Sequence, residues 1–185
     1  MKRIVVLLCV MLLLSGCSGK KQEMDRALTL RSKLLSKAVG FDAQITADYG
    51  DKTYTFSMNC KTDSQGNLTF KVIEPEIISG ISGTVSATGG KLEFNDVALA
   101  FELMADGQFS PVSGPWLLMK TLRSGYLTSC TREGDAYRIS VDDSYNDDAL
   151  HLDVWLNGED VPVRGEIMWQ GRRLLTISVK NFTFL

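Results

Sequence analysis

Most of the sequence after Gly40 alternates between apolar and polar side chains. In the first such segment, 41–49, apolar and polar residues take turns: Phe41, Ala43, Ile45, Ala47 and Tyr49 against Asp42, Gln44, Thr46 and Asp48. A period of two gives a β-strand one buried face and one wet face. A chain with this pattern has to fold as an amphipathic antiparallel sheet whose apolar face is covered by another element.

Turn-forming residues divide this pattern into about eleven strands. Gly50-Asp51 joins the first strand to the second, and Gln65-Gly66-Asn67 precedes the third. The predicted strands are 41–49, 53–60, 68–73, 81–87, 91–94, 97–103, 126–131, 136–141, 150–156, 161–169 and 174–182.

Two segments have the spacing of helices instead. Residues 22–39 contain neither Pro nor Gly, and apolar positions recur there at three- and four-residue steps, around Arg31, before Gly40 ends the helix: Met24, Leu28, Leu35 and Ala38 or Val39. The second helix begins at Pro115 and ends before Gly125, with Trp116, Leu117, Leu118, Met119 and Leu122 between them.

These elements predict a mainly β (α+β) fold. About eleven strands approach the limit of an open twisted sheet, which tends to curl or close. We therefore expect an incomplete antiparallel β-barrel with two or three helices covering the concave face, although periodicity alone does not separate it from a closed barrel.

The amino-terminal residues have the organisation of a secretory signal. Lys2 and Arg3 precede eleven consecutive apolar residues, 4–14, a run too short to span a bilayer, which takes about 20 residues. The following Leu14-Ser15-Gly16-Cys17 resembles the lipobox of bacterial lipoproteins, in which the cysteine sulfur carries lipid. An ordinary cleaved signal with an incidental cysteine is the alternative.

We therefore predict a signal peptide at 1–16, a lipidated tether at 17–21 and a single domain at 22–185. Lipid on Cys17 would anchor the protein to the extracytoplasmic face of a bacterial cell membrane, and stable anchoring needs more than one acyl chain.

The order of elements resembles the lipoprotein-localisation-factor (LolA/LolB-like) superfamily. The segments that carry the resemblance are Phe70-Lys71-Val72-Ile73-Glu74-Pro75, Gly83-Thr84-Val85 and Phe109-Ser110-Pro111. The resemblance implies an unclosed barrel whose helices form a lid over an apolar cavity, which holds acyl chains in the transport members. Certain lipoproteins of spore formers that bind a cell-wall enzyme look similar in length and layout.

Apolar residues on the predicted inner face are the candidates for lining such a cavity. They are Ile45, Tyr54, Phe56, Met58, Phe70, Val85 and Trp116. The same side chains would equally fill a core, because burial of large apolar side chains stabilises any domain of this size.

Several classes of function find no support. A net charge of −2 offers nothing to nucleic acid, and the single histidine, His151, excludes a two-histidine metal site. His151 falls on the wet face of its strand without a nucleophile beside it, and 142–148 fails the EF-hand pattern and reads as a solvated loop. We expect no enzyme, no metal and no cofactor.

Two further features leave alternatives open. Cys60 and Cys130 form an even pair in an oxidising compartment, which suits either a disulfide or two buried thiols. The segment 181–185 changes phase relative to Leu175, Ile177 and Val179, as a β-bulge or a partner-facing aromatic edge would.

The function expected from these features is binding. The chain reads as an anchored envelope lipoprotein that holds a lipid or lipoprotein acyl chain in a half-barrel cavity. The alternative is a non-catalytic lipoprotein that docks and regulates an envelope protein such as a cell-wall enzyme.

Overall fold

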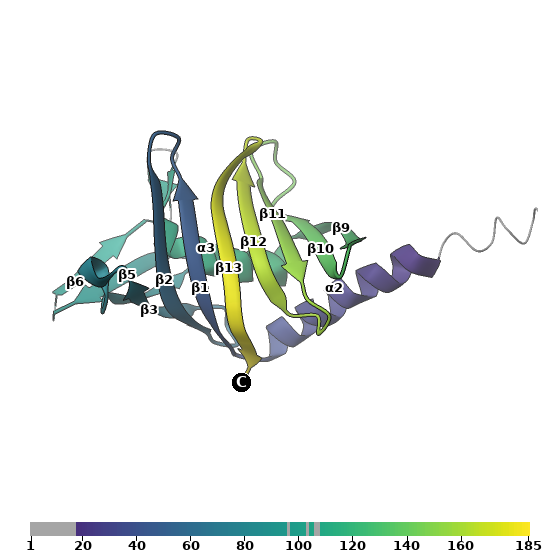
Figure 1. The fold of residues 1–185 in the computed structure, drawn as a ribbon, viewed down its shortest axis with the longest axis horizontal. Coiled ribbons are helices and arrows are strands. Elements are labelled where there is room, and N and C mark those ends of the chain that lie inside the picture. The colour runs from purple at the N-terminus through teal and green to yellow at the C-terminus, as the bar shows by residue number, and fades with distance from the viewer. Residues whose placement is uncertain (1–17, 96, 103, 106–107) are drawn as a thin grey trace, which may run out of the picture.

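The computed structural model describes residues 18–95, 97–102, 104–105 and 108–185. One sheet contains eleven antiparallel strands, as the alternation predicts, and the order of its strands does not close on itself (Figure 1). Its strands are β1 (Val39–Asp48), β2 (Thr53–Thr62), β3 (Leu68–Glu74), β4 (Ser82–Ser86), β5 (Gly89–Phe94), β6 (Val97–Phe101), β9 (Tyr126–Glu133), β10 (Ala136–Asp142), β11 (Leu150–Leu156), β12 (Pro162–Trp169) and β13 (Arg172–Phe184).

The order of strands in this sheet is β6-β5-β4-β3-β2-β1-β13-β12-β11-β10-β9. The first and last strands of the chain therefore pair at the centre, where Ile45 lies opposite Ile177. The free edges are β6 and β9. After β6 the chain forms a small second sheet of two strands, β7 (Met104–Ala105) and β8 (Gln108–Phe109).

The predicted alternation is visible in the burial of each strand. In β1 the residues of one face, Val39, Phe41, Ala43, Ile45 and Ala47, are all buried. The hairpin to β2 turns at Gly50, whose φ of 93° suits glycine, and the backbone N–H of Gly50 donates to Oδ1 of Asp48 at 2.8 Å.

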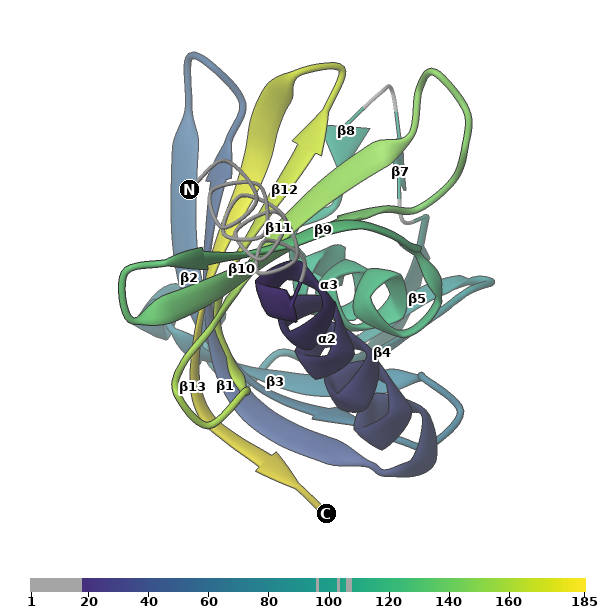
Figure 2. The same ribbon diagram turned by 90° about the vertical axis from the view of Figure 1, so that its right-hand side faces the viewer.

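Helix α3 (Gly114–Ser124) lies inside the curve of the sheet (Figure 2). It is apolar around most of its circumference, so an interior position is the one that buries all of its apolar surface. Trp116 links this helix to the β2–β3 turn, because its indole Nε1–H donates to the carbonyl of Gly66 at 3.0 Å. Short 3-10 helices precede it at Pro111–Ser113 and follow β3 at Glu76–Ile78.

Helix α2 (Ser18–Ser36) differs from the prediction in its ends and its buried face. It begins earlier, and Val39 and Gly40 belong to β1, where Val39 pairs with Thr62 and Phe184. Its buried residues are Ala27, Leu30 and Leu34, whereas Leu28 and Leu35 are half exposed. The helix has two possible apolar faces, one with Leu28 and Leu35 and one with Leu30 and Leu34. The face that also contains the small Ala27 is the one that packs inward.

The carboxyl-terminal phase change is a β-bulge. Along the β1–β13 ladder, Gly40 pairs with Thr183 and Asp42 with Lys180, so two residues of β13 oppose Phe41 alone. Asn181 takes a φ of 52°, and its Nδ2–H donates to Oδ2 of Asp42 at 2.6 Å.

The helices cover only part of the sheet. Their main contacts are with β2, β9, β10, β12 and β13. The amino end of α2 and the edge strand β6 lie at opposite ends of the long axis (Figure 1). No helix among the described residues has the length and hydropathy to cross a membrane.

Candidate apolar binding site

The structure places the predicted cavity residues in the core. Six of the seven are buried: Ile45, Phe56, Met58, Phe70, Val85 and Trp116. Tyr54 is 50% exposed near the β1–β2 turn, where its ring meets that of Tyr49 edge to face. The six buried side chains form one hydrophobic cluster with those of α3.

One row of cross-strand neighbours leads out of this core. Phe41 pairs with Cys60, Cys60 with Phe70, Phe70 with Gly83, Gly83 with Leu92 and Leu92 with Leu99. Residues directly opposite each other in antiparallel strands share a face. The row is therefore the concave face throughout, yet it passes from Phe70, 4% exposed, to Leu99, 64% exposed.

A second row runs parallel to the first, through Thr62, Leu68, Val85, Gly90 and Phe101. A Cβ on Gly90 would lie 2.1 Å from the Phe101 ring, so this glycine is what lets the ring lie flat on the strand. Gly83 makes the same room for Phe70.

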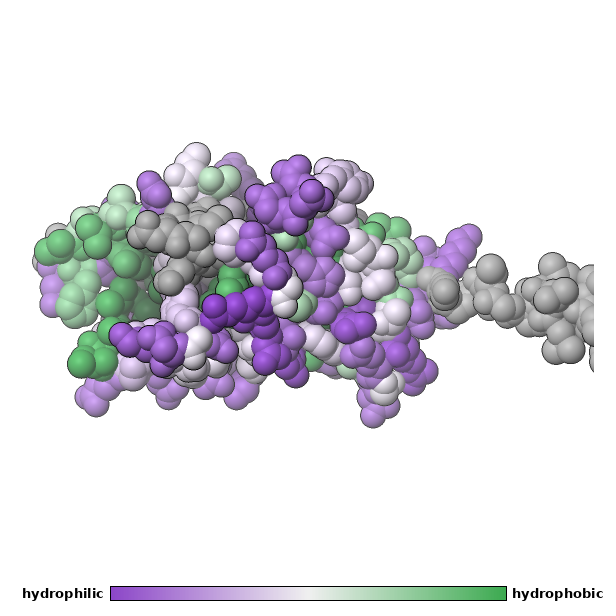
Figure 3. Space-filling model, turned by 90° about the horizontal axis from the view of Figure 1, so that it is seen from above, coloured by the Kyte–Doolittle hydropathy of each residue, from purple (hydrophilic) through white to green (hydrophobic). Residues whose placement is uncertain are grey.

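The uncovered part of the concave face is an apolar surface that we call the open strip. It consists of Leu92, Phe94, Val97, Leu99 and Phe101, on β5 and β6. Val97 is 69% exposed. Figure 3 shows apolar side chains gathered at the end of the molecule where Figure 1 places these strands.

Sequence reasoning found the strand at 97–103 without identifying it as part of a site. One signal was present: Val97-Ala98-Leu99-Ala100-Phe101 has no polar residue in either phase, unlike the other exposed strands. A strand without a wet face at a sheet edge indicates a binding surface or an aggregation risk.

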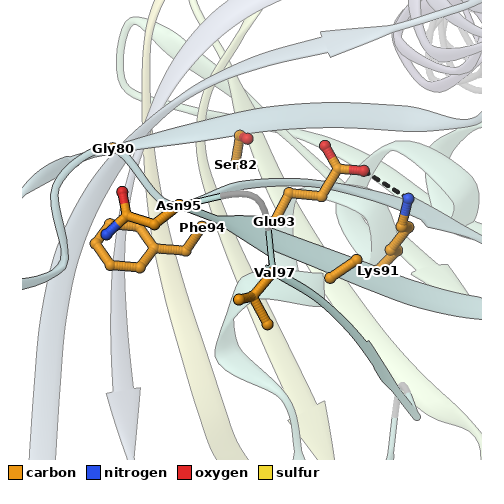
Figure 4. Close-up of a pocket in the computed structure, with 8 residues that line it drawn as sticks. Gly80, Ser82, Lys91, Glu93, Phe94, Asn95 and Val97 are labelled. Atoms are coloured by element: carbon orange, nitrogen blue, oxygen red, sulfur yellow. Dashed lines mark ion pairs between the residues drawn. The ribbon is translucent and has the colours of Figure 1, made fainter.

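The convex face of β5 is charged, whereas that of β6 carries only alanine. An open depression of about 410 Å³ at this end of the sheet is lined by Ser82, Lys91 and Glu93 together with Phe94, Val97 and Ala98 (Figure 4). Lys91 Nζ lies 2.6 Å from Glu93 Oε1 there, so its lining is less uniformly apolar than the open strip.

His151 lies in a polar network on β10 and β11. Its Nδ1 is 2.6 Å from Asp142 Oδ1, and its Nε2 is 3.4 Å from Asp153 Oδ1. Ser140 Oγ–H donates to that same Asp153 oxygen at 2.6 Å. Sequence reasoning missed this serine, but its proton goes to a carboxylate and not to the imidazole, which does not activate it as a nucleophile. The described residues contain no cluster that could hold a metal ion.

Cys60 and Cys130 are buried free thiols in this structure, on β2 and β9. Between these two strands lie β1, β13, β12, β11 and β10. Burial raises the pKa of both thiols, with Asp42 adding to the effect at Cys60. The signal peptide and Cys17 lie outside the described residues.

No protein-family model and no curated protein matches the chain. Solved structures do match it across most of its length. An uncharacterized conserved protein from Thermus thermophilus is 12% identical, with a TM-score of 0.48, over 89% of this chain and 86% of that one. A LolA superfamily protein from Nitrosomonas europaea is 9% identical, with a TM-score of 0.46, over 86% and 93%.

A third similar structure is the lipoprotein LppX of Mycobacterium tuberculosis, 11% identical, with a TM-score of 0.41, over 87% of this chain and 93% of that one. What these three structures share with the chain is the course of the backbone.

Proposed function

We propose that the chain is an envelope lipoprotein, anchored through Cys17, that binds an apolar ligand along the open strip. The ligand class is a lipid or a lipoprotein acyl chain. The observation that carries the proposal is the row from Phe70 through Gly83 and Leu92 to Leu99, a core face that continues into solvent.

An acyl chain lying on this strip would complete the core at its uncovered end. Each buried methylene contributes about 0.8 kcal/mol. A ligand with several methylenes against Leu99 and Val97 therefore gains enough to offset part of the cost of association.

The protein's own lipid is poorly placed to be this ligand. Helix α2 has 19 residues, so it is about 28 Å long at 1.5 Å per residue. Its amino end, next to Cys17, points away from β6 (Figure 1). A separate apolar molecule is the ligand that this arrangement favours.

The test is displacement of a fluorescent fatty acid from the purified mature domain. Leu99→Asp puts a charge on the open strip and is expected to lower affinity at least tenfold. Ala98→Asp puts the same charge on the opposite face of the same strand and is expected to leave affinity within twofold. Equal losses in both variants, or no displaceable binding by the wild type, would overturn the proposal.

The anchor has its own test. Mass spectrometry of the mature protein should show acyl mass on Cys17, and Cys17→Ala should retain the signal segment without lipid. A wild type recovered as an unmodified secreted chain would contradict the anchored form.

The alternative is an interaction lipoprotein that docks an envelope protein. It replaces the proposed function if fatty acids fail to bind and a defined envelope protein binds instead. Neither function requires a chemical step by this chain.

A further inference from the structure

No strand among the described residues pairs with the outer edge of β6, and this backbone edge is a second surface distinct from the open strip. We infer that this edge takes up an extended segment of a partner protein as a twelfth strand of the sheet. The inference concerns the main chain of β6 and does not depend on ligand uptake by the side chains of its concave face.

The two free edges of the sheet differ in their protection. At the other edge, α2 packs against β9, and β9 itself ends in Arg132 and Glu133. The edge strand β6 has no charged residue and no proline, and Val97, Ala98, Leu99 and Ala100 are all exposed. Natural proteins protect such edges with charges, proline or covering elements unless the edge binds a partner, because unpaired backbone N–H and C=O groups can pair with another strand.

Charge around β6 specifies the ends of the partner segment. Asp96 precedes the strand in the sequence and Glu102 follows it. A partner strand is therefore favoured if basic residues flank an apolar centre.

A second copy of this chain does not supply such flanks. The residues of β6 carry no charge, and the residue that follows them, Glu102, is acidic.

The two faces of β6 specify the side chains of the partner's centre. On the concave side the added strand would lie beside Val97, Leu99 and Phe101, where apolar side chains fit. On the convex side it would lie beside Ala98 and Ala100, which border open depressions of about 410 and 570 Å³. Alternating valine and threonine meets both requirements.

The probe is the peptide Lys-Val-Thr-Val-Thr-Val-Lys, added to the mature protein. We expect saturable binding together with slowed amide hydrogen exchange confined to 97–101. Two further peptides carry N-methyl groups on alternate backbone amides, one peptide for each of the two possible sets. They distinguish pairing through the main chain from simple apolar adsorption, because N-methylation removes the hydrogen-bond donors. At least one of these two peptides is expected to lose binding, because it lacks the hydrogen bonds to the edge.

Charge exchange gives the sharper readout. The peptide with glutamate at both ends should bind about tenfold more weakly than the lysine form. Glu102→Lys should reduce that preference, while Asp147→Lys, an equal change of net charge in the exposed loop before β11, should leave it unchanged.

The inference is overturned if both methylated peptides bind as well as the parent peptide, or if 97–101 exchanges no more slowly with peptide present. It is also overturned if the protein alone dimerises with protection of 97–101, which would make the second copy the occupant. Fatty-acid binding without peptide binding would overturn this inference and leave the proposed function standing.

Discussion

Arg31 of α2 and Arg123 of α3 each cap the other's helix. Arg31 Nε–H donates to the carbonyl of Leu122 at 2.8 Å, and Arg123 Nη1–H donates to the carbonyl of Leu34 at 2.6 Å. The two carbonyl groups lie in the last turns of α3 and α2, where backbone C=O groups have no hydrogen-bond partner within their own helix. The two helices inside the sheet are thus held together by a reciprocal pair of charged hydrogen bonds.

Loss of these hydrogen bonds between the two helices should destabilise the fold. Arg123 also donates from Nη2 to the carbonyl of Ser64 at 2.6 Å, so one guanidinium joins α2, α3 and the β2–β3 turn. Arg123→Ala is expected to lower the free energy of unfolding by about 2 kcal/mol, since hydrogen bonds to charged groups contribute roughly 1.5–3 kcal/mol. Urea denaturation measures it.

Arg123→Lys is the matched control for this prediction. It keeps the charge but has no planar fork with which to reach two carbonyls at once. It should recover less than half of the loss, and full recovery would show that charge alone matters there.

The thiols of Cys60 and Cys130 should be unreactive toward thiol reagents in the folded protein. Because burial raises the pKa of Cys60 and Cys130, both stay protonated at pH 8 and are shielded from a thiol reagent. In the denatured mature protein we expect two reactive thiols without added reductant, in addition to Cys17 if that residue carries no lipid. A count of zero would mean that a disulfide forms.

The same shift sets a pH dependence. Above the ordinary thiol pKa of 9.0, the unfolded chain loses thiol protons that the folded chain retains, so the free energy of unfolding falls as the pH rises. Replacing both cysteines by alanine should flatten this part of the pH profile. An unchanged slope would contradict the assignment to the thiols.

Thr62 offers a test of buried polarity. Its side chain is fully buried between Val39 and Leu68 on neighbouring strands, and its hydroxyl has no hydrogen-bond partner among the described residues. Thr62→Val keeps the shape and removes the hydroxyl, so it should raise the free energy of unfolding by about 1 kcal/mol. Thr62→Ala, which leaves a gap, should lower it, and a loss in both variants would indicate that the hydroxyl is satisfied.

Gly90 and Phe101 should be energetically coupled. A methyl group on Gly90 meets the Phe101 ring at 2.1 Å, so Gly90→Ala is expected to destabilise the domain by about 1–3 kcal/mol through overpacking. Combining it with Phe101→Ala should recover most of that loss. A double-mutant cycle measures the coupling, and strict additivity would show that the ring is not held over the glycine.

The sheet and α3 could be predicted from the sequence because their patterns are local. Alternation along β1 determines its buried face, and the apolar circumference of α3 calls for an interior position. The face of α2 was predicted wrongly, because Leu28 and Leu30 lie on different stripes and only packing selects between them.

The open strip could not be predicted, because exposure of Leu99 depends on how far the helices extend over the sheet. That extent is a property of the tertiary structure, and nothing in the local period of β6 encodes it. The polar-free composition of 97–101 was the one local indication.

The central claim, an apolar ligand on the open strip, is tested most directly by a fatty acid carrying a nitroxide on its chain. Methyl resonances of the protein broaden when they lie near the nitroxide. We expect stronger broadening at Leu92, Val97 and Leu99 than at Leu117 and Leu118 of the buried helix α3. Broadening at the α3 leucines with none at Leu92, Val97 and Leu99 would place the ligand under the helices and contradict the claim.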